Sequence, residues 1–144
     1  MRIEKVAFGS ARYQEMVEKR EAWLRAPLGL GARPQDTARD EEEIHIAAID
    51  KDRVIGVLLL RPLDTARVKM RQVAVAPASS GRGIGTRLVE FSERLARDAG
   101  FQIIELHARQ TAVPFYEKLA YTVVSEPFEE IGIPHVKMEK KLEG

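Results

Sequence analysis

Hydrophobic and polar positions alternate along the chain, and the period of the alternation distinguishes helices from strands. From Ile84 to Ala99, apolar residues recur at intervals of three or four and charged residues fall between them. This spacing predicts an amphipathic helix with a water-facing charged side, ended by Gly100. A second helix is predicted from Ser10, whose hydroxyl can cap the first turn, to about Arg25.

Shorter segments carry the alternation that is typical of strands. Strands are predicted over residues 2–7, 44–50, 53–62, 67–76, 101–107, 121–126 and 136–141, and a short helix over residues 111–119. The strands between residues 44 and 76 follow one another across short turns, so they predict an antiparallel meander. Residues 27–42 are rich in Gly, Pro and charge, which predicts a loop with a helical turn near residues 36–39, placed to act as a substrate lid.

Three glycines separate the strand over residues 67–76 from the long helix. Gly81, Gly83 and Gly85 can adopt positive φ angles and allow a bulky group to approach the backbone. The unpaired N–H groups at the start of the following helix attract negative charge. The turn therefore predicts a site for a pyrophosphate.

Other functions for this glycine turn are also considered. A Walker loop requires lysine after its last glycine, whereas Gly85 is followed by Thr86. A dinucleotide fingerprint matches at Gly81 and Gly83 and would use Glu105 for a ribose, but its third glycine is replaced by Thr86. The chain after Glu105 is also too short for the rest of a doubly wound sheet. A helix cap without a ligand remains an alternative.

Three segments in order resemble the acyl-CoA-binding core of the GNAT N-acetyltransferase superfamily. They are Val-Ala-Val-Ala-Pro at residues 73–77, Ser-Gly-Arg-Gly-Ile-Gly at residues 80–85, and the segment from Ala112 to Tyr121. Ser80 stands where the family has Gln or Arg, and Arg109 stands where it usually has Asn. Arg82 could supply charge-assisted contacts in place of the first of these side chains.

The resemblance implies an α/β fold in which a mixed, mostly antiparallel and splayed sheet is flanked by helices, as one domain over residues 1–144. It implies transfer of an acetyl group from acetyl-CoA directly to an amine of a small molecule or peptide. The alternative is an acyl-CoA-binding module of the same fold with weakened catalysis. The residues implied to bind acetyl-CoA are Val73, Ala74, Val75, Ser80, Gly81, Arg82, Gly83, Ile84, Gly85, Thr86, Arg109, Ala112 and Phe115.

The resemblance also implies roles in the reaction. The backbone N–H of Val73 would stabilise the thioester carbonyl, and the Tyr116 hydroxyl would act as the general acid that protonates the departing thiolate. A general base must deprotonate the amine, yet the strand before the glycine turn contains no acid. His107, at the end of the strand that should diverge from the Val73 strand, is the candidate base.

Other titratable residues offer alternatives for the base or for acceptor binding. Glu43, His45 and Glu105 are further candidate bases, while His135 could line a substrate pocket or fix a turn. The acids Glu126, Glu129 and Glu130 could attract a cationic acceptor or form a solvated loop face.

Composition narrows the classes of function. The chain has 144 residues, a net charge of +1, no cysteine and three scattered histidines, so we expect no disulfide, no metal site and no nucleic-acid partner. No segment has the apolar length of a membrane span or of a signal peptide core, so we expect a cytoplasmic protein without a membrane partner. A homodimer is compatible with the sequence.

Overall fold

The computed structural model describes residues 1–30 and 37–143. Its strands are β1 (Arg2–Val6), β2 (Ile44–Asp50), β3 (Arg53–Pro62), β4 (Arg67–Val75), β5 (Ile103–Arg109), β6 (Thr122–Val123), β7 (Phe128–Glu130) and β8 (Ile133–Lys141). Its helices are α1 (Ala11–Arg20), α2 (Ile84–Asp98) and α3 (Val113–Lys118). Shorter helical turns are η1 (Glu21–Arg25), η2 (Ala26–Leu28), η4 (Asp40–Glu42), η5 (Pro77–Ser79) and η6 (Gln110–Ala112). No helix in this part of the chain is long and apolar enough to cross a membrane.

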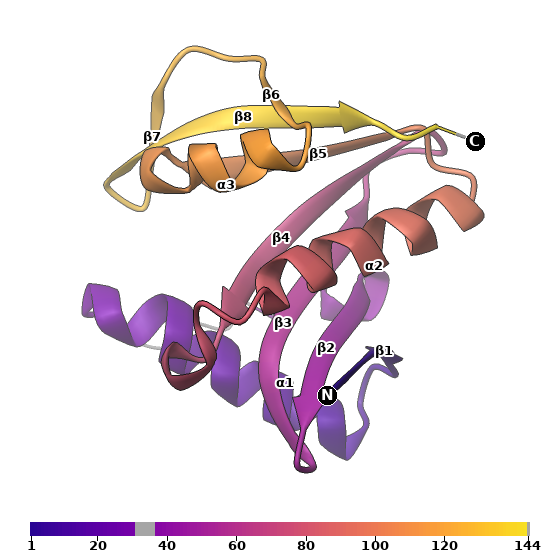
Figure 1. Cartoon of the computed structure of the whole chain (residues 1–144), viewed down its shortest axis with the longest axis vertical. Coiled ribbons are helices and arrows are strands. Elements are labelled where there is room, and N and C mark those ends of the chain that lie inside the picture. Colours follow the sequence, from indigo (N-terminus) through magenta and orange to yellow (C-terminus); the bar gives the residue numbers. More distant parts are fainter. Residues whose placement is uncertain (31–36, 144) are drawn as a thin grey trace.

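The strands form one sheet that opens in its middle. Their order is β1-β2-β3-β4-β5-β8-β6, with β7 paired to β8 (Figure 1). All neighbours are antiparallel except β4 and β5, which pair in parallel only from Arg67 opposite Ile103 to Met70 opposite Leu106. Beyond that point β4 and β5 separate, which confirms the predicted mixed, mostly antiparallel and splayed sheet.

Helices cover the two faces of the sheet unequally. The first face packs against α2 and α3 in a core that includes Leu58, Leu88, Leu106 and Tyr116. On the opposite face, α1 covers β2 and β3 in a smaller core around Met16. The opposite face of β5 therefore carries polar residues in place of an apolar helix contact.

The helices begin close to where the sequence predicts them. Ser10 caps α1 by accepting a hydrogen bond from the Tyr13 N–H, but the predicted helix to Arg25 changes to a π-helical turn after Arg20. In α2 the buried positions include Leu88, Val89, Ser92 and Ala96. The predicted apolar residues Phe91 and Leu95 pack, partly buried, against the same core, whereas Ala99 at the end of the stripe is exposed.

The C-terminal strands differ from the prediction. The expected strand over residues 121–126 is reduced to β6, and β7 forms where a loop was expected. Ile131 and Gly132 both have positive φ angles, 48° and 69°, which allows a tight hairpin between β7 and β8. His135 therefore lies within a strand and not in a loop.

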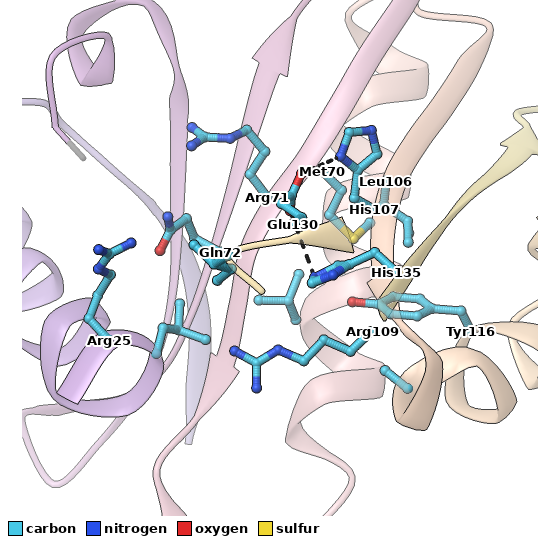
Figure 2. Close-up of a pocket in the computed structure, with 14 residues that line it drawn as sticks. Arg25, Met70, Arg71, Gln72, Leu106, His107, Arg109, Tyr116, Glu130 and His135 are labelled. Carbon is cyan, nitrogen blue, oxygen red and sulfur yellow. Dashed lines mark hydrogen bonds and ion pairs between the residues drawn. The ribbon is translucent and has the colours of Figure 1, made fainter. Parts of the chain in front are cut away.

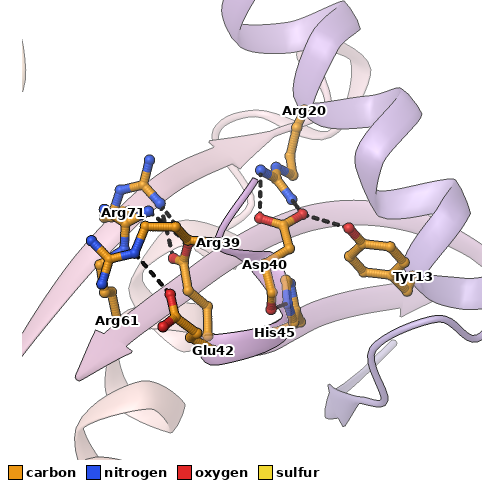
Figure 3. A network of polar contacts seen from close by, with 9 residues as sticks. Tyr13, Arg20, Arg39, Asp40, Glu42, His45, Arg61 and Arg71 are labelled. Carbon is orange, nitrogen blue, oxygen red and sulfur yellow. Dashed lines mark hydrogen bonds and ion pairs between the residues drawn. The ribbon is translucent and has the colours of Figure 1, made fainter. Parts of the chain in front are cut away.

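The predicted lid over residues 27–42 lies partly outside the described residues. Within the described part, η2 ends at Gly29, and the helical turn expected near residues 36–39 is found at Asp40–Glu42. Asp40 fixes this turn, since its buried carboxylate accepts hydrogen bonds from Tyr13 at 2.6 Å and Arg20 at 2.8 Å (Figure 3).

Candidate active site

A β-bulge in β4 lies at the point where β4 leaves β5. Ala74 pairs with Val57 and Arg71 pairs with Leu59, so two residues of β4, Gln72 and Val73, lie opposite one residue of β3. Gln72 has a φ of 56°, which is uncommon for a residue with a side chain. The bulge interrupts the hydrogen-bond ladder and changes which side chains face each side of the sheet.

A cavity of about 310 Å³ lies beside this bulge. Five residues that the sequence assigned to the site line it: Val73, His107, Arg109, Ala112 and Tyr116. Nine further residues line it (Figure 2). For two of them, Glu130 and His135, contact with an acceptor was one of the alternatives from the sequence, whereas seven had no predicted site role: Leu24, Arg25, Met70, Arg71, Gln72, Leu106 and Ile131. The splayed strands, η1 and the β7–β8 hairpin therefore meet around one space.

Tyr116 presents its hydroxyl to this cavity. Its side chain comes from α3 and points inward (Figure 2), and the residue is 8% exposed. Burial raises the pKa of Tyr116 to about 12, so its hydroxyl is protonated at neutral pH. Among the described residues this hydroxyl has no hydrogen-bond partner, so it is free to donate a hydrogen bond to a ligand.

His107 and His135 flank the carboxylate of Glu130. The His107 Nδ1 atom lies 2.8 Å from Glu130 Oε1, and the His135 Nε2 atom lies 3.7 Å from Glu130 Oε2 (Figure 2). Burial acts to raise the pKa of Glu130, but the bond from His107 and the nearby cationic groups outweigh it and lower the pKa. The ionised carboxylate favours the tautomer in which His107 Nδ1 carries the proton, which leaves Nε2 as an acceptor.

The other base candidates lie outside the cavity lining. Glu43 is paired with Arg61 and Arg71, and Glu105 is paired with Arg67 at 3.0 Å. The His45 Nε2 atom lies 2.8 Å from the Asp40 carbonyl oxygen (Figure 3). These contacts give all three residues structural partners.

The glycine turn has the open backbone that the sequence predicts at two of its three glycines. Gly81 and Gly83 have φ angles of 80° and 75°, and a Cβ atom at either would meet nothing within 4 Å. Gly85 has no positive φ, contrary to the prediction. A Cβ atom at Gly85 would lie 3.4 Å from the Phe115 ring and 3.8 Å from Val75, which is ordinary van der Waals contact, so this glycine lies against side chains and not in open space.

The side chains around the turn have varied surroundings. The Ser80 hydroxyl donates to the Pro77 carbonyl at 2.9 Å, so it stabilises the turn. Arg82 is exposed and lies 3.7 Å from Asp50, and Thr86 is partly buried at the first turn of α2. Ile84 is a core residue, so only its backbone is available to a ligand.

Contacts connect the turn to the cavity. Val73, Val75, Ala112 and Phe115 pack against the core on the α2 face, whereas Ala74 packs against the core on the α1 face. Phe115 bridges the two ends of the site, because it lies over Gly85 and contacts the Tyr116 ring at a centroid distance of 5.0 Å. Phe115 thus links Gly85 of the turn to Tyr116 of the cavity lining.

A sequence pattern could have indicated the contact between Glu130 and His107, which was not predicted. Ile131-Gly132 between short β-type segments is a hairpin signal, and pairing across it places Phe128 opposite His135. That hairpin brings Glu130 to His107. The positions of Arg25 and Arg71 depend on the packing of η1 against β4. Local sequence patterns do not predict this packing.

Comparison with known proteins identifies relatives of this chain. The uncharacterized N-acetyltransferase YjcF of Bacillus subtilis (strain 168) is 33% identical over 102 residues, 70% of this chain and 72% of that protein. A second protein of that organism, provisionally named an acetyltransferase, is 36% identical over 87 residues, and the match covers 56% of this chain and 59% of that protein.

Solved structures share the whole fold. A protein of Lactobacillus plantarum, provisionally named an N-acetyltransferase, has a TM-score of 0.88 and 28% identity, covering 99% of this chain and 98% of that chain. An aminoglycoside 6'-N-acetyltransferase solved with coenzyme A has a TM-score of 0.80 and 20% identity, covering 100% and 98%, and this likeness concerns the fold. A family model described as an acetyltransferase (GNAT) domain matches residues 29–142, so the chain belongs to the GNAT acetyltransferase family.

Proposed function

We propose that this chain transfers an acetyl group from acetyl-CoA directly to the amine of a small acceptor. The observation that carries the proposal is that a buried phenol and a His–Glu pair line one cavity, which Phe115 connects to the open glycine turn. Family membership supports acyl transfer to an amine. The roles given to the reacting groups follow from the family resemblance, and their shared cavity supports them.

The turn would hold the pyrophosphate of acetyl-CoA. Backbone N–H groups at the start of α2 are unpaired donors and attract negative charge, and the open space at Gly81 and Gly83 lets phosphate oxygens approach them. Arg82 is exposed there and can add a charge-assisted contact. The backbone of Val73 and Val75, at the free side of β4, would pair with the pantetheine amides as an added strand does.

The residues in the cavity would then divide the reaction between them. The Val73 N–H stabilises the carbonyl oxygen as the amine nitrogen attacks the thioester carbon. Nε2 of His107 accepts the proton that the attacking nitrogen loses. When the carbon–sulfur bond breaks, Tyr116 donates its proton to the sulfur, which leaves as the CoA thiol. Proton exchange with water restores Tyr116 and His107.

A binding module without catalysis is the second candidate. It is favoured by Ser80, whose hydroxyl is used within the turn, and by Arg109, which replaces the Asn usual at that position. Such a module would bind acetyl-CoA and leave it intact. Binding and turnover must therefore be measured separately.

The experiment that tests the proposal combines both measurements. Calorimetric titration with acetyl-CoA reports binding, and incubation with a panel of primary amines is followed by thiol release and by the mass of the acetylated amine. We expect binding and a product heavier by one acetyl group, in equal amount to the released thiol. Binding without product from any amine would favour the module, and the absence of binding would refute both functions.

A further inference from the structure

Arginine side chains gather on the face of β4 and β5 that α1 leaves uncovered. On β5, Leu106 and Ala108 face the core beneath α2 and α3, whereas His107 and Arg109 face the other way into the cavity. Arg71 of β4 lines the same cavity. This side of the cavity therefore carries one arginine on each of the two splayed strands.

Arg71 belongs to a cluster with excess positive charge. The Glu43 side chain is fully buried and accepts hydrogen bonds from Arg71 at 2.8 and 2.9 Å and from Arg61 at 2.9 Å. One carboxylate thus serves two guanidinium groups. Within the described part of the chain, Glu43 contacts only the Nη1 atom of Arg71, so the remaining donors of that guanidinium can serve a ligand in the cavity.

The remaining charges of the cavity do not offset this excess. Among the described residues that line it, Arg71 and Arg109 are cations on the two splayed strands, and Glu130 is the acid. Glu130 is already engaged by His107, and Arg109 forms no ion pair within the described part of the chain. Next to the cavity, burial lowers the pKa of Lys69. The charge of Glu130 acts to raise this pKa, whereas the positive charges of Arg71 and Arg61 lower it further.

We propose that the acceptor is a small amine that also carries a carboxylate, and that Arg71 binds this carboxylate while the amine faces His107. The inference rests on the proposed acetyl transfer and names the class of its second substrate. Guanidinium groups bind carboxylates through paired, charge-assisted hydrogen bonds, whereas an acceptor bearing only cations would be repelled. A cavity of about 310 Å³, shared with the acetyl end of the cofactor, suits a molecule of amino-acid size.

Binding of matched ligands tests the charge preference without requiring catalysis. N-Acetylglycine and N-acetyl-β-alanine are compared with their carboxamides by calorimetry, with and without CoA. We expect the carboxylates to bind about tenfold or more tightly than the amides, the usual effect of a hydrogen bond to a charged group. Equal affinity of each pair, or no detectable binding of any of these ligands, would overturn the inference.

Turnover gives the second measurement. Glycine, β-alanine and γ-aminobutyrate are compared with glycinamide, with spermidine and with an aminoglycoside as acceptors of the acetyl group. Higher kcat/KM for the amino acids supports the inference, and higher kcat/KM for the amide or the polycations contradicts it. If carboxylates bind preferentially but no acetyl group moves, the anion site stands and the proposed function fails.

Substitutions test whether Arg71 is the residue that causes the preference for carboxylate-bearing acceptors. Arg71→Gln should remove most of the carboxylate preference mainly through KM, and Arg71→Lys should keep part of it because the charge remains. Arg97→Gln, an exposed position on α2, is the matched control and should behave as wild type. Thermal unfolding of each variant checks the fold, and the ligand pairs on wild type decide the question if Arg71→Gln does not fold. Full preference in folded Arg71→Gln would contradict the assignment to Arg71.

Discussion

Burial determines the protonation state of Tyr116, the residue with the most specific role in the proposed reaction. A phenol with a pKa of about 12 remains protonated from neutral to moderately alkaline pH. Its hydroxyl is also uncommitted within the described part of the chain. Tyr116 is therefore protonated at neutral pH and available as a donor to the departing sulfur.

Replacing Tyr116 with Phe tests this role, because the ring and its packing remain. We expect kcat to fall by about 10²-fold or more while acetyl-CoA affinity changes little, as for loss of a general acid. The deficit should narrow as pH rises, since a thiolate leaves unaided in alkaline solution. Single-turnover rates from neutral to alkaline pH provide the measurement. A mutant as fast as wild type throughout would make Tyr116 a packing residue.

Glu130 is a positioning residue in this account, since it acts through His107. Glu130→Gln should lower kcat by at least about tenfold with a smaller change in KM, because the amide no longer fixes the His107 tautomer. The matched control is Glu129→Gln, which removes the same charge from an exposed neighbour on β7. Steady-state kinetics of the two variants across pH decide the matter. Equal effects of both would show that only net charge matters.

The same pair predicts a pH dependence of stability. The lowered pKa of Glu130 means that its ionised form favours the folded state above the unfolded-state pKa of about 4.3. This contribution is lost as pH falls through the lower folded-state pKa. Glu130→Gln should accordingly lower the melting temperature at neutral pH, and its difference from wild type should shrink in acid. A difference that grows in acid would reverse the assigned sign.

At the scale of elements, the start of α2 and its end offer a matched pair of glycines. Gly83 precedes the helix with a φ of 75°, and Gly100 follows it with a φ of 94°. A β-branched residue at either position is strained, with a cost of about 1–3 kcal/mol in the free energy of unfolding. Only Gly83 belongs to the proposed pyrophosphate site.

Comparing Gly83→Val with Gly100→Val separates strain from ligand binding. We expect both variants to lose stability, but only Gly83→Val to lose acetyl-CoA affinity, by about tenfold or more if one good phosphate contact is blocked. Calorimetric titration of the folded variants measures this. Unchanged affinity in Gly83→Val would remove the turn from the binding site.

A hydrogen bond between α1 and η4 gives a second prediction at the scale of elements. The Tyr13 hydroxyl donates to the buried Asp40 carboxylate at 2.6 Å. Tyr13→Phe should lower the free energy of unfolding by about 1–3 kcal/mol, because a buried acceptor loses a partner. Tyr116→Phe is the control, since that hydroxyl has no such bond among the described residues. Denaturant unfolding that shows equal stability for both variants would contradict the contribution of this tie.

At the scale of the whole molecule, the sequence predicts the α2 side of the protein better than the opposite side. The glycine turn, the long helix and the strand after it are contiguous, so local patterns and the family resemblance identify them together. The cavity wall is assembled from η1, β4, β5 and the β7–β8 hairpin, which are far apart in the sequence. Arg25, Arg71 and Glu130 meet there through tertiary packing, which local periodicity does not encode.

The predictions that were wrong have the same cause: they concern tertiary packing, which local sequence patterns do not encode. Ala99 is exposed because α2 leaves the sheet surface at its end, and the surroundings of Gly85 depend on Phe115, 30 positions away in the sequence. The roles of Val73, Tyr116 and His107 remain predictions. Their convergence on one cavity is the structural support for them.

The central claim is direct transfer of the acetyl group from acetyl-CoA to an amine in the cavity between β4 and β5. The most direct test is a rapid-quench experiment with acetyl-CoA labelled at the acetyl carbonyl carbon, excess protein and a carboxylate-bearing amine. The account predicts that label appears on the amine at the rate at which CoA thiol is released, with none on the protein at any time. Label that passes through the protein, or that stays on acetyl-CoA while it is bound, would contradict it.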